Sequence, residues 1–221
     1  MEHLFSEVDA YFSEKLVGND PLFDKLLQNN EKYGLPPHDV SPSQGKFLYL
    51  LAKIKGAKRI LEIGTLGGYS SLWFAKALDS DGQLISLEFD SKHAAVAKEN
   101  LTAANVSDQV TILVGAAAES LKHMVLSETA PFDLIFIDAD KENNSVYLEY
   151  ALKLAKPGTI IIGDNVVRDG AVLVANSTDG RVQGVRSFVD DLAAHPKLSS
   201  IAIETVGVKG YDGFTISIVE F

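Results

Sequence analysis

The segment from Arg59 to Ser71, R-I-L-E-I-G-T-L-G-G-Y-S-S, constrains the fold more than any other part of the chain. The short apolar run at 60–63 predicts a buried strand, and glycines follow at 64, 67 and 68. Apolar residues at helical spacing over 69–78 then predict a helix. Such a strand–loop–helix unit favours a ligand site, because glycines admit close approach of the backbone and the first N–H groups of a helix are unpaired.

The spacing of these glycines favours an amino-acid ligand over a dinucleotide. The dinucleotide fingerprint is G-x-G-x-x-G, whereas this chain has E-x-G-x-x-G-G and carries Leu66 at the position of the middle glycine. The carboxylate of Glu62 lies two residues before Gly64, where it would attract a ligand ammonium group. A zwitterion therefore fits this loop better than a pyrophosphate.

The composition excludes several classes of function. The chain has 221 residues and is 46% hydrophobic, enough for one well-buried domain. Its net charge of −10 disfavours nucleic acids and anionic membranes, which need clustered Lys and Arg, and the absence of cysteine removes disulfides and cysteine nucleophiles. The start of the chain lacks the basic residues of a secretory signal, and no uncharged run approaches the roughly 18 residues of a membrane span. We therefore expect a cytoplasmic protein whose partners are small molecules.

Strand-type and helix-type patterns alternate along most of the chain. Two amphipathic helices are expected within 1–33 and a third over 43–55. The later patterns predict strands near 59–63, 83–88, 110–114, 132–138 and 158–163, and helices near 69–79, 91–104, 117–127 and 144–155. This alternation predicts a parallel sheet with helices on both faces and ligands beyond the carboxyl ends of its strands.

The last third departs from this alternation. It predicts a helix over 182–194 and two strands, 201–206 and 214–219, joined as a hairpin at one sheet edge. No linker or repeat divides the chain. We expect a single domain, 1–221, with an N-terminal helical cap over 1–57 and a sheet core over 58–221.

The second expected strand delivers an acid at its carboxyl end. Glu88 lies 24 residues after Gly64, about the offset at which an acidic residue binds ribose hydroxyls in nucleotide-binding folds. The neighbouring Phe89 offers a flat apolar face for a purine, and the small residues from Ala116 leave room for a base. The alternatives are that Glu88 is an ordinary surface acid, that Phe89 belongs to the core, and that the small residues from Ala116 only begin a helix.

Two neighbouring apolar runs end in oxygen-bearing side chains. The run over 132–137 is followed by Asp138, and the run over 159–163 by Asp164 and Asn165. Adjacent parallel strands would bring these three residues together. Such an all-oxygen set without histidine suits a hard divalent ion such as Mg²⁺, although the sequence does not separate it from Mn²⁺ or Ca²⁺. The alternative is that these residues only cap strands or begin helices.

Lys141 lies three residues after Asp138. A partly desolvated lysine beside a cation loses its proton more readily, so its amine would accept a proton from a substrate. The alternative is an ordinary ion pair with Asp140 or Glu142. The five histidines lack zinc spacing, and the common hydrolase and NTPase motifs are absent.

Four segments of the chain resemble the cation-dependent class I S-adenosylmethionine (SAM) O-methyltransferases of the catechol and caffeoyl-CoA type. They are L-E-I-G-T-L-G-G-Y-S, L-I-S-L-E, F-D-L-I-F-I-D-A-D-K and L-A-K-P-G-T-I-I-I-G-D-N. The resemblance covers about 38–221 in matching order, and D-A-D-K followed by G-D-N is specific to this group. Asp140 stands where the animal catechol enzymes have a tryptophan, so the chain is similar to the bacterial and plant branch.

The resemblance implies an α/β fold, a Rossmann-like αβα sandwich in a homodimer. Its seven-stranded, mostly parallel sheet has the order 3-2-1-4-5-7-6, with strand 7 antiparallel. In the implied site, the methionine part of SAM is surrounded by Val40, Glu62, Gly64 and Ser70. Glu88 binds the ribose, and Phe89 and Ala116 lie beside the adenine. Asp138, which also borders the cofactor, binds the metal together with Asp164 and Asn165, and Lys141 is the general base.

The implied activity is metal-dependent methyl transfer to a hydroxyl of a small aromatic vicinal diol, such as a catechol, hydroxycinnamate or flavonoid. A coenzyme A thioester acceptor would need a basic rim. The negative net charge of the chain disfavours it, since only Arg168, Arg181 and Arg186 lie near the expected site. Two other classes stay open, a NAD-dependent oxidoreductase on the same fold and a non-catalytic cofactor-binding protein. Polar segments at 34–42 and 167–181 are candidate lids.

Overall fold

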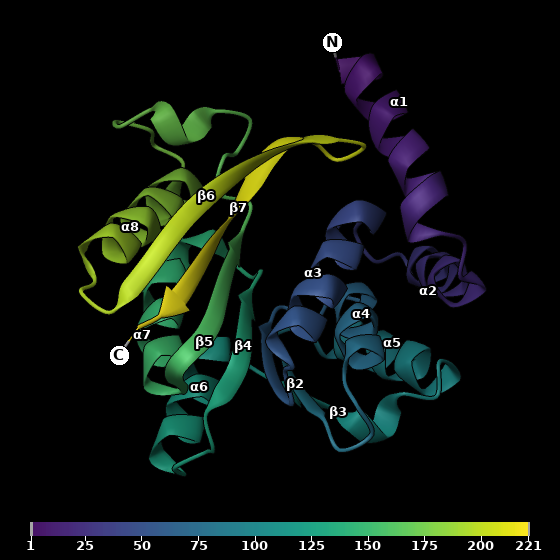
Figure 1. Ribbon diagram of the computed structural model, residues 1–221, viewed down its shortest axis with the longest axis horizontal. Helices are drawn as coiled ribbons and strands as arrows, with labels where there is room; N and C mark the ends of the chain where they lie inside the picture. Colours follow the sequence, from purple (N-terminus) through teal and green to yellow (C-terminus); the bar gives the residue numbers. More distant parts are fainter. Residues whose placement is uncertain (1, 221) are drawn as a thin grey trace.

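The computed structural model describes residues 2–220 and contains a seven-stranded sheet in the order β3-β2-β1-β4-β5-β7-β6 (Figure 1). The strands are β1 (Arg59–Ile63), β2 (Gln83–Glu88), β3 (Val110–Val114), β4 (Phe132–Ile137), β5 (Ala155–Asp164), β6 (Leu198–Gly207) and β7 (Gly210–Val219). β1 to β5 are parallel, and β7 pairs antiparallel with both β5 and β6. The sheet order and the antiparallel seventh strand predicted from the sequence are confirmed.

Helices cover both faces of this sheet. They are α1 (Glu2–Phe12), α2 (Pro21–Lys32), α3 (Pro42–Lys55), α4 (Tyr69–Ala77), α5 (Ser91–Ala103), α6 (Ala117–Leu126), α7 (Asn144–Lys153) and α8 (Gly180–Ala194), with a π-helical turn at Ser13–Val17 and 3₁₀ turns at Ser107–Gln109, Lys141–Asn143 and Ala171–Leu173. One apolar core lies between the sheet and α2 to α5, and a second lies between the sheet and α6 to α8. Strand residues alternate between them, so that Ile60 faces the first core and Leu61 the second.

Local sequence signals set where the helices begin. The side chains of Asp20, Ser41, Asp90 and Asp179 each accept a backbone N–H from the first turn of the helix that follows. α2 and α3 also have proline at their first position, where its missing N–H costs no hydrogen bond. These helices therefore begin close to the positions predicted from the sequence. Within residues 2–220, none of the helices has the length and apolar character needed to span a membrane.

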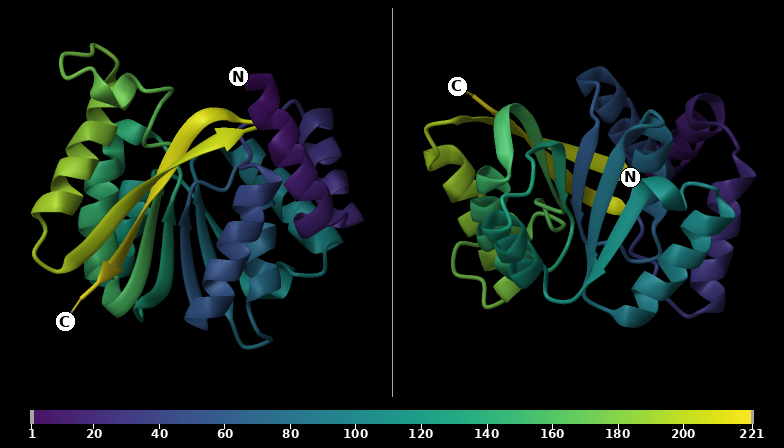
Figure 2. Two further views of the ribbon diagram at one scale, coloured as in Figure 1. Left: turned by 45° about the horizontal axis from the view of Figure 1, so that its top comes forward. Right: turned by 90° about the horizontal axis from the view of Figure 1, so that it is seen from below.

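The hairpin of β6 and β7 extends beyond the sheet to the N-terminal helices. Its turn lies beside α1 in both views of Figure 2, and the backbone N–H of Val208 donates to the Asp9 carboxylate at 3.0 Å. A Cβ atom on Gly207 would lie 2.4 Å from the same carboxylate, so a larger residue there would push the Asp9 side chain aside. Segments from the two ends of the chain thus enclose one side of the molecule.

Candidate active site

A cavity of about 1270 Å³ lies at the carboxyl ends of the parallel strands. Its walls come from the loop after β1, the ends of β2, β4 and β5, the segment before α3, and the β6–β7 hairpin. Of the eleven residues predicted to bind cofactor or metal or to act in catalysis, ten line this cavity: Val40, Gly64, Ser70, Glu88, Phe89, Ala116, Asp138, Lys141, Asp164 and Asn165. The exception is Glu62.

The glycine loop packs directly against the end of β4. Gly64 has φ +104°, and a Cβ atom there would lie 2.0 Å from the backbone oxygen of Asp138, so only glycine fits. Leu66 also has positive φ, +49°, and its backbone N–H and that of Thr65 both donate to Glu88, at 2.8 and 3.1 Å. The loop is therefore held between β2 and β4 in a shape that turns Ser70 toward the cavity.

Glu62 lies beneath the cavity rather than on its wall, which corrects the expectation that it contacts a ligand ammonium directly. Its side chain is fully buried, and its carboxylate accepts hydrogen bonds from the hydroxyls of Ser70, Ser71 and Ser86. Burial raises the pKa of Glu62 to about 7, and the three hydroxyl groups oppose that shift. Glu62 therefore supports the loop through Ser70, which does line the cavity.

The end of β2 presents the two residues expected at the nucleoside part of a cofactor. Glu88 is buried, with Oε2 held by the loop and Oε1 accepting the backbone N–H of Asp90 at 2.8 Å. Phe89 is 79% exposed, so the alternative that it belongs to the core is wrong. Ala116 borders the same part of the cavity and leaves it open, because its side chain is a single methyl group.

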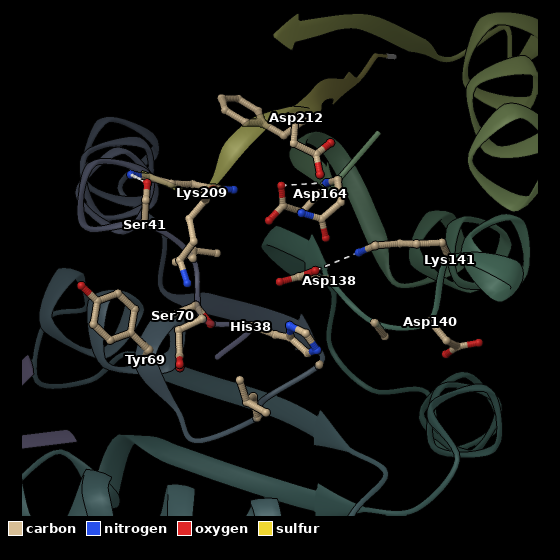
Figure 3. A pocket seen from close by; sticks show the side chains of 18 of the residues that line it. His38, Ser41, Tyr69, Ser70, Asp138, Asp140, Lys141, Asp164, Lys209 and Asp212 are labelled. Carbon is tan, nitrogen blue, oxygen red and sulfur yellow. Dashed lines mark hydrogen bonds and ion pairs between the residues drawn. The ribbon is translucent and has the colours of Figure 1, made fainter. Parts of the chain in front are cut away.

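The ends of β4 and β5 bring the predicted metal ligands to one place. Asp138 and Asp164 point into the same part of the cavity in Figure 3, and Asn165 follows Asp164 with φ +56°. Lys141, 6% exposed, donates to Asp138 at 2.8 Å. Burial, and then the neighbouring Asp138 carboxylate, raise the pKa of Asp164, while Lys141 lowers it.

The donor chemistry of this cluster fits a divalent cation. Two carboxylates and one amide oxygen are ligands that hard cations prefer. Asp164 is buried and Asp138 is half-buried, so one lysine beside them leaves negative charge to compensate. Residues 2–220 contain no group of three or more His, Cys, Asp or Glu side chains arranged to hold a metal. A cation bound here would therefore need the Asn165 oxygen, and oxygens from water or substrate, in addition to the two carboxylates.

Sequence reasoning missed the wall contributed by the hairpin, and it missed Asp39 next to the predicted Val40 in the segment before α3. Asp39, Lys209 and Asp212 line the cavity beside the predicted residues. One oxygen of Asp212 accepts the backbone N–H groups of Val167 and Arg168, each at 3.0 Å. These residues could not be predicted because the contact is long-range. The hairpin lies far along the chain, and its sequence has no motif that indicates which loop it packs against.

The sheet order, the glycine loop and the acidic strand ends are those of the class I SAM-dependent methyltransferases. The model of a family described as O-methyltransferase matches residues 13–217. The chain belongs to this O-methyltransferase family, and it is a SAM-dependent enzyme that methylates oxygen. The oxidoreductase and the non-catalytic alternatives are therefore set aside.

Individual relatives agree with this assignment. A catechol O-methyltransferase from Niastella koreensis is 46% identical over 217 residues, which cover 98% of each chain. The structure of an O-methyltransferase from Bacillus cereus in complex with SAH has a TM-score of 0.98 and 51% identity, and covers 100% of both chains. TomG from Streptomyces achromogenes, in complex with SAM, has a TM-score of 0.96 and 44% identity, and covers 100% of this chain and 99% of its own.

Proposed function

We propose that this enzyme transfers the methyl group of SAM to one hydroxyl of a small aromatic vicinal diol, with a divalent cation held by Asp138, Asp164 and Asn165. The observation that carries the proposal is the position of these three residues and Lys141 beside the glycine loop in one cavity (Figure 3). The catechol O-methyltransferase name of the Niastella koreensis relative supports the acceptor class.

The cofactor occupies the half of the cavity formed by β1 and β2. Val40, Gly64 and Ser70 border the methionine part in this assignment, with Ser70 fixed by its hydrogen bond to buried Glu62, 2.6 Å long. Glu88 holds the ribose, because its carboxylate oxygens keep lone pairs free after accepting the backbone N–H groups of the loop. Complexes of the relatives with SAH and SAM support SAM as the cofactor.

The acceptor occupies the half formed by β4, β5 and the hairpin. A bound Mg²⁺ or similar cation would supply a Lewis acid that favours the ionised diol. Lys141, as the neutral amine, accepts the proton from the reacting hydroxyl, so it must first lose the proton with which it pairs to Asp138. Asp138 and Asp164 would hold such a cation beside the acceptor, so the contribution of these residues is mostly positioning and electrostatics.

A coenzyme A thioester is the alternative acceptor. Its phosphates would need a basic rim, whereas Arg181 is already bound to Asp179 through two hydrogen bonds of 2.7 and 3.0 Å. Arg186 donates to a backbone oxygen of Val172 at 2.5 Å. Of the three arginines expected near the site, only Arg168 has no side-chain partner within the described residues, and one arginine does not form a basic rim for several phosphates. The small diol is therefore the preferred substrate.

The test is methyl transfer from labelled SAM to neutral vicinal diols and to their monohydroxy analogues. We expect the diols to be methylated and the single phenols to react at least about 100-fold more slowly, because one oxygen alone does not chelate. Equal rates for diols and single phenols would reject the proposed acceptor class.

The homodimer implied by the family resemblance is also proposed. Large apolar side chains are exposed on α1 and β6, including Leu4 at 57% and Ile201 at 63%, and such surfaces mark protein contacts. Light scattering should give twice the mass of the chain. A monomer at micromolar concentration would contradict the dimer.

A further inference from the structure

We infer that Arg168 forms a subsite for an anionic group on the acceptor, so that the preferred substrates are dihydroxylated aromatic acids. Arg168 lines the cavity three residues after Asn165 and is half-buried. This inference rests on the proposed function, because it specifies what the vicinal diol carries away from its reacting oxygens.

The backbone at Arg168, where the chain lines the cavity, is held in a strained conformation. Arg168 and Asp169 both have positive φ, +56° and +53°, which side chains other than glycine rarely adopt. Asp212 of β7 accepts the backbone N–H of Arg168, and Asp169 donates its own to Tyr211 at 3.2 Å. The start of β7 therefore determines where the arginine lies.

The guanidinium group of Arg168 is available for a ligand. Within residues 2–220 it makes no hydrogen bond or ion pair, although five N–H donors would match a carboxylate in a bidentate pair. Its charge is felt by Asp179, whose carboxylate is already bound to Arg181. Arg168 is thus a cavity cation whose side chain has no bonded acid.

Lys209 lies on the same wall and adds a second positive charge. It is carried by the turn just before β7, and its amine donates to the backbone oxygen of Pro37 at 3.1 Å. Burial raises the pKa of nearby Asp39, whereas the charge of Lys209 lowers it, so Lys209 is partly balanced by that acid. The Lys209 amine is also occupied by Pro37, whereas the Arg168 guanidinium has no hydrogen bond within residues 2–220, so Arg168 is the principal ligand and Lys209 the lesser one.

This wall carries two basic side chains, Arg168 and Lys209, together with the acids Asp39 and Asp212, and the Asp212 carboxylate already accepts backbone N–H groups. Lys141 is paired with Asp138, and the other strand ends carry acids. A diol held at Asp138 and Asp164 thus has a carboxylate-binding arginine within the same cavity, in a chain of net charge −10. Benzoate-type and cinnamate-type acids meet this requirement, whereas neutral and cationic catechols do not use it.

The test compares an acid with its neutral twin, 3,4-dihydroxybenzoate and its methyl ester. In the wild type we expect kcat/KM to be about tenfold higher for the acid, the effect of a charge-assisted hydrogen bond. Arg168→Gln should remove that preference and leave kcat/KM for the ester within about twofold. Lys209→Met should lower the ratio less.

Three further variants keep the result interpretable. Arg168→Asn, which tolerates positive φ better, should give the same loss of preference if Arg168→Gln folds poorly. Arg168→Glu should reverse the preference toward a catechol bearing an aminoethyl group. The surface variant Lys153→Gln, whose lysine pairs with Glu149 on α7, should leave the ratio unchanged.

An equal fall for acid and ester in all Arg168 variants, or an unchanged ratio, would overturn the subsite. These results differ from a failure of the proposed function, in which the wild type would methylate neither compound. If the ester is methylated but the acid-to-ester ratio of kcat/KM is the same in the wild type and the Arg168 variants, only the subsite is rejected.

Discussion

Gly64 lies against the backbone oxygen of Asp138, so closely that a Cβ atom on the glycine would come within 2.0 Å of it. This contact joins the loop assigned to the cofactor to the first residue assigned to the metal. The two halves of the site are therefore not independent, because any change that moves the loop also moves the end of β4.

Gly64→Ala should damage both halves at once. The added methyl group would displace Asp138, and φ +104° is strained for alanine, so we expect a loss of at least about 2 kcal/mol in the free energy of unfolding and much weaker SAM binding. Gly34→Ala is the matched control, since Gly34 has φ +67° but open space around it. Chemical unfolding and calorimetric SAM titration distinguish the two, and similar SAM affinities would contradict this view of the contact.

Glu62 should make the stability of the protein depend on pH. Its pKa is raised by burial from an ordinary 4.5 to about 7, so the folded protein holds a proton that the unfolded chain releases between these values. The free energy of unfolding therefore falls as pH rises through this window, by up to about 3 kcal/mol.

The variant Glu62→Gln isolates that contribution. The difference in unfolding free energy between wild type and variant should shrink or change sign from pH 4.5 to 7, whereas exposed Glu119→Gln should show no such trend. Parallel stability curves for wild type and Glu62→Gln would mean that the buried carboxyl titrates normally.

Phe89→Ala should weaken cofactor binding without affecting the fold. The ring is 79% exposed, so removing it costs little packing, and we expect a change within about 0.5 kcal/mol in stability. Loss of stacking on a base should raise the Kd for SAM about tenfold. Leu126→Ala, at a residue 74% exposed on α6, is the control. An unchanged Kd would remove Phe89 from the adenine site.

The parallel sheet could be predicted because its strands are short apolar runs separated by helical patterns. The hairpin was predicted too short, over 201–206 and 214–219, whereas its strands are Leu198–Gly207 and Gly210–Val219. β6 is an edge strand with mostly exposed residues, and its missed start includes the exposed polar residues Ser199 and Ser200, so that end carries no apolar signal.

The site residues were predictable wherever an apolar strand ends directly in polar side chains. Asp138, Asp164 and Asn165 belong to this group, and all three line the cavity. The burial of Glu62 was not predictable, because Ser70 and Ser86 come from different elements and meet it only in the folded chain. The position of Arg168 was unpredictable for the same reason, because its backbone is held by Asp212 on a strand distant in the sequence.

The central claim, that the ends of β4 and β5 hold one divalent cation, is tested most directly by titrating Mn²⁺ into the wild type and into Asp164→Asn. The variant should fold, since it removes a buried charge, and it should bind SAM normally. We predict one bound ion per chain in the wild type and an affinity lower by about 100-fold or more in the variant, with methyl transfer lost in excess chelator. Equal Mn²⁺ binding by both proteins, or full activity in the chelator, would contradict the account.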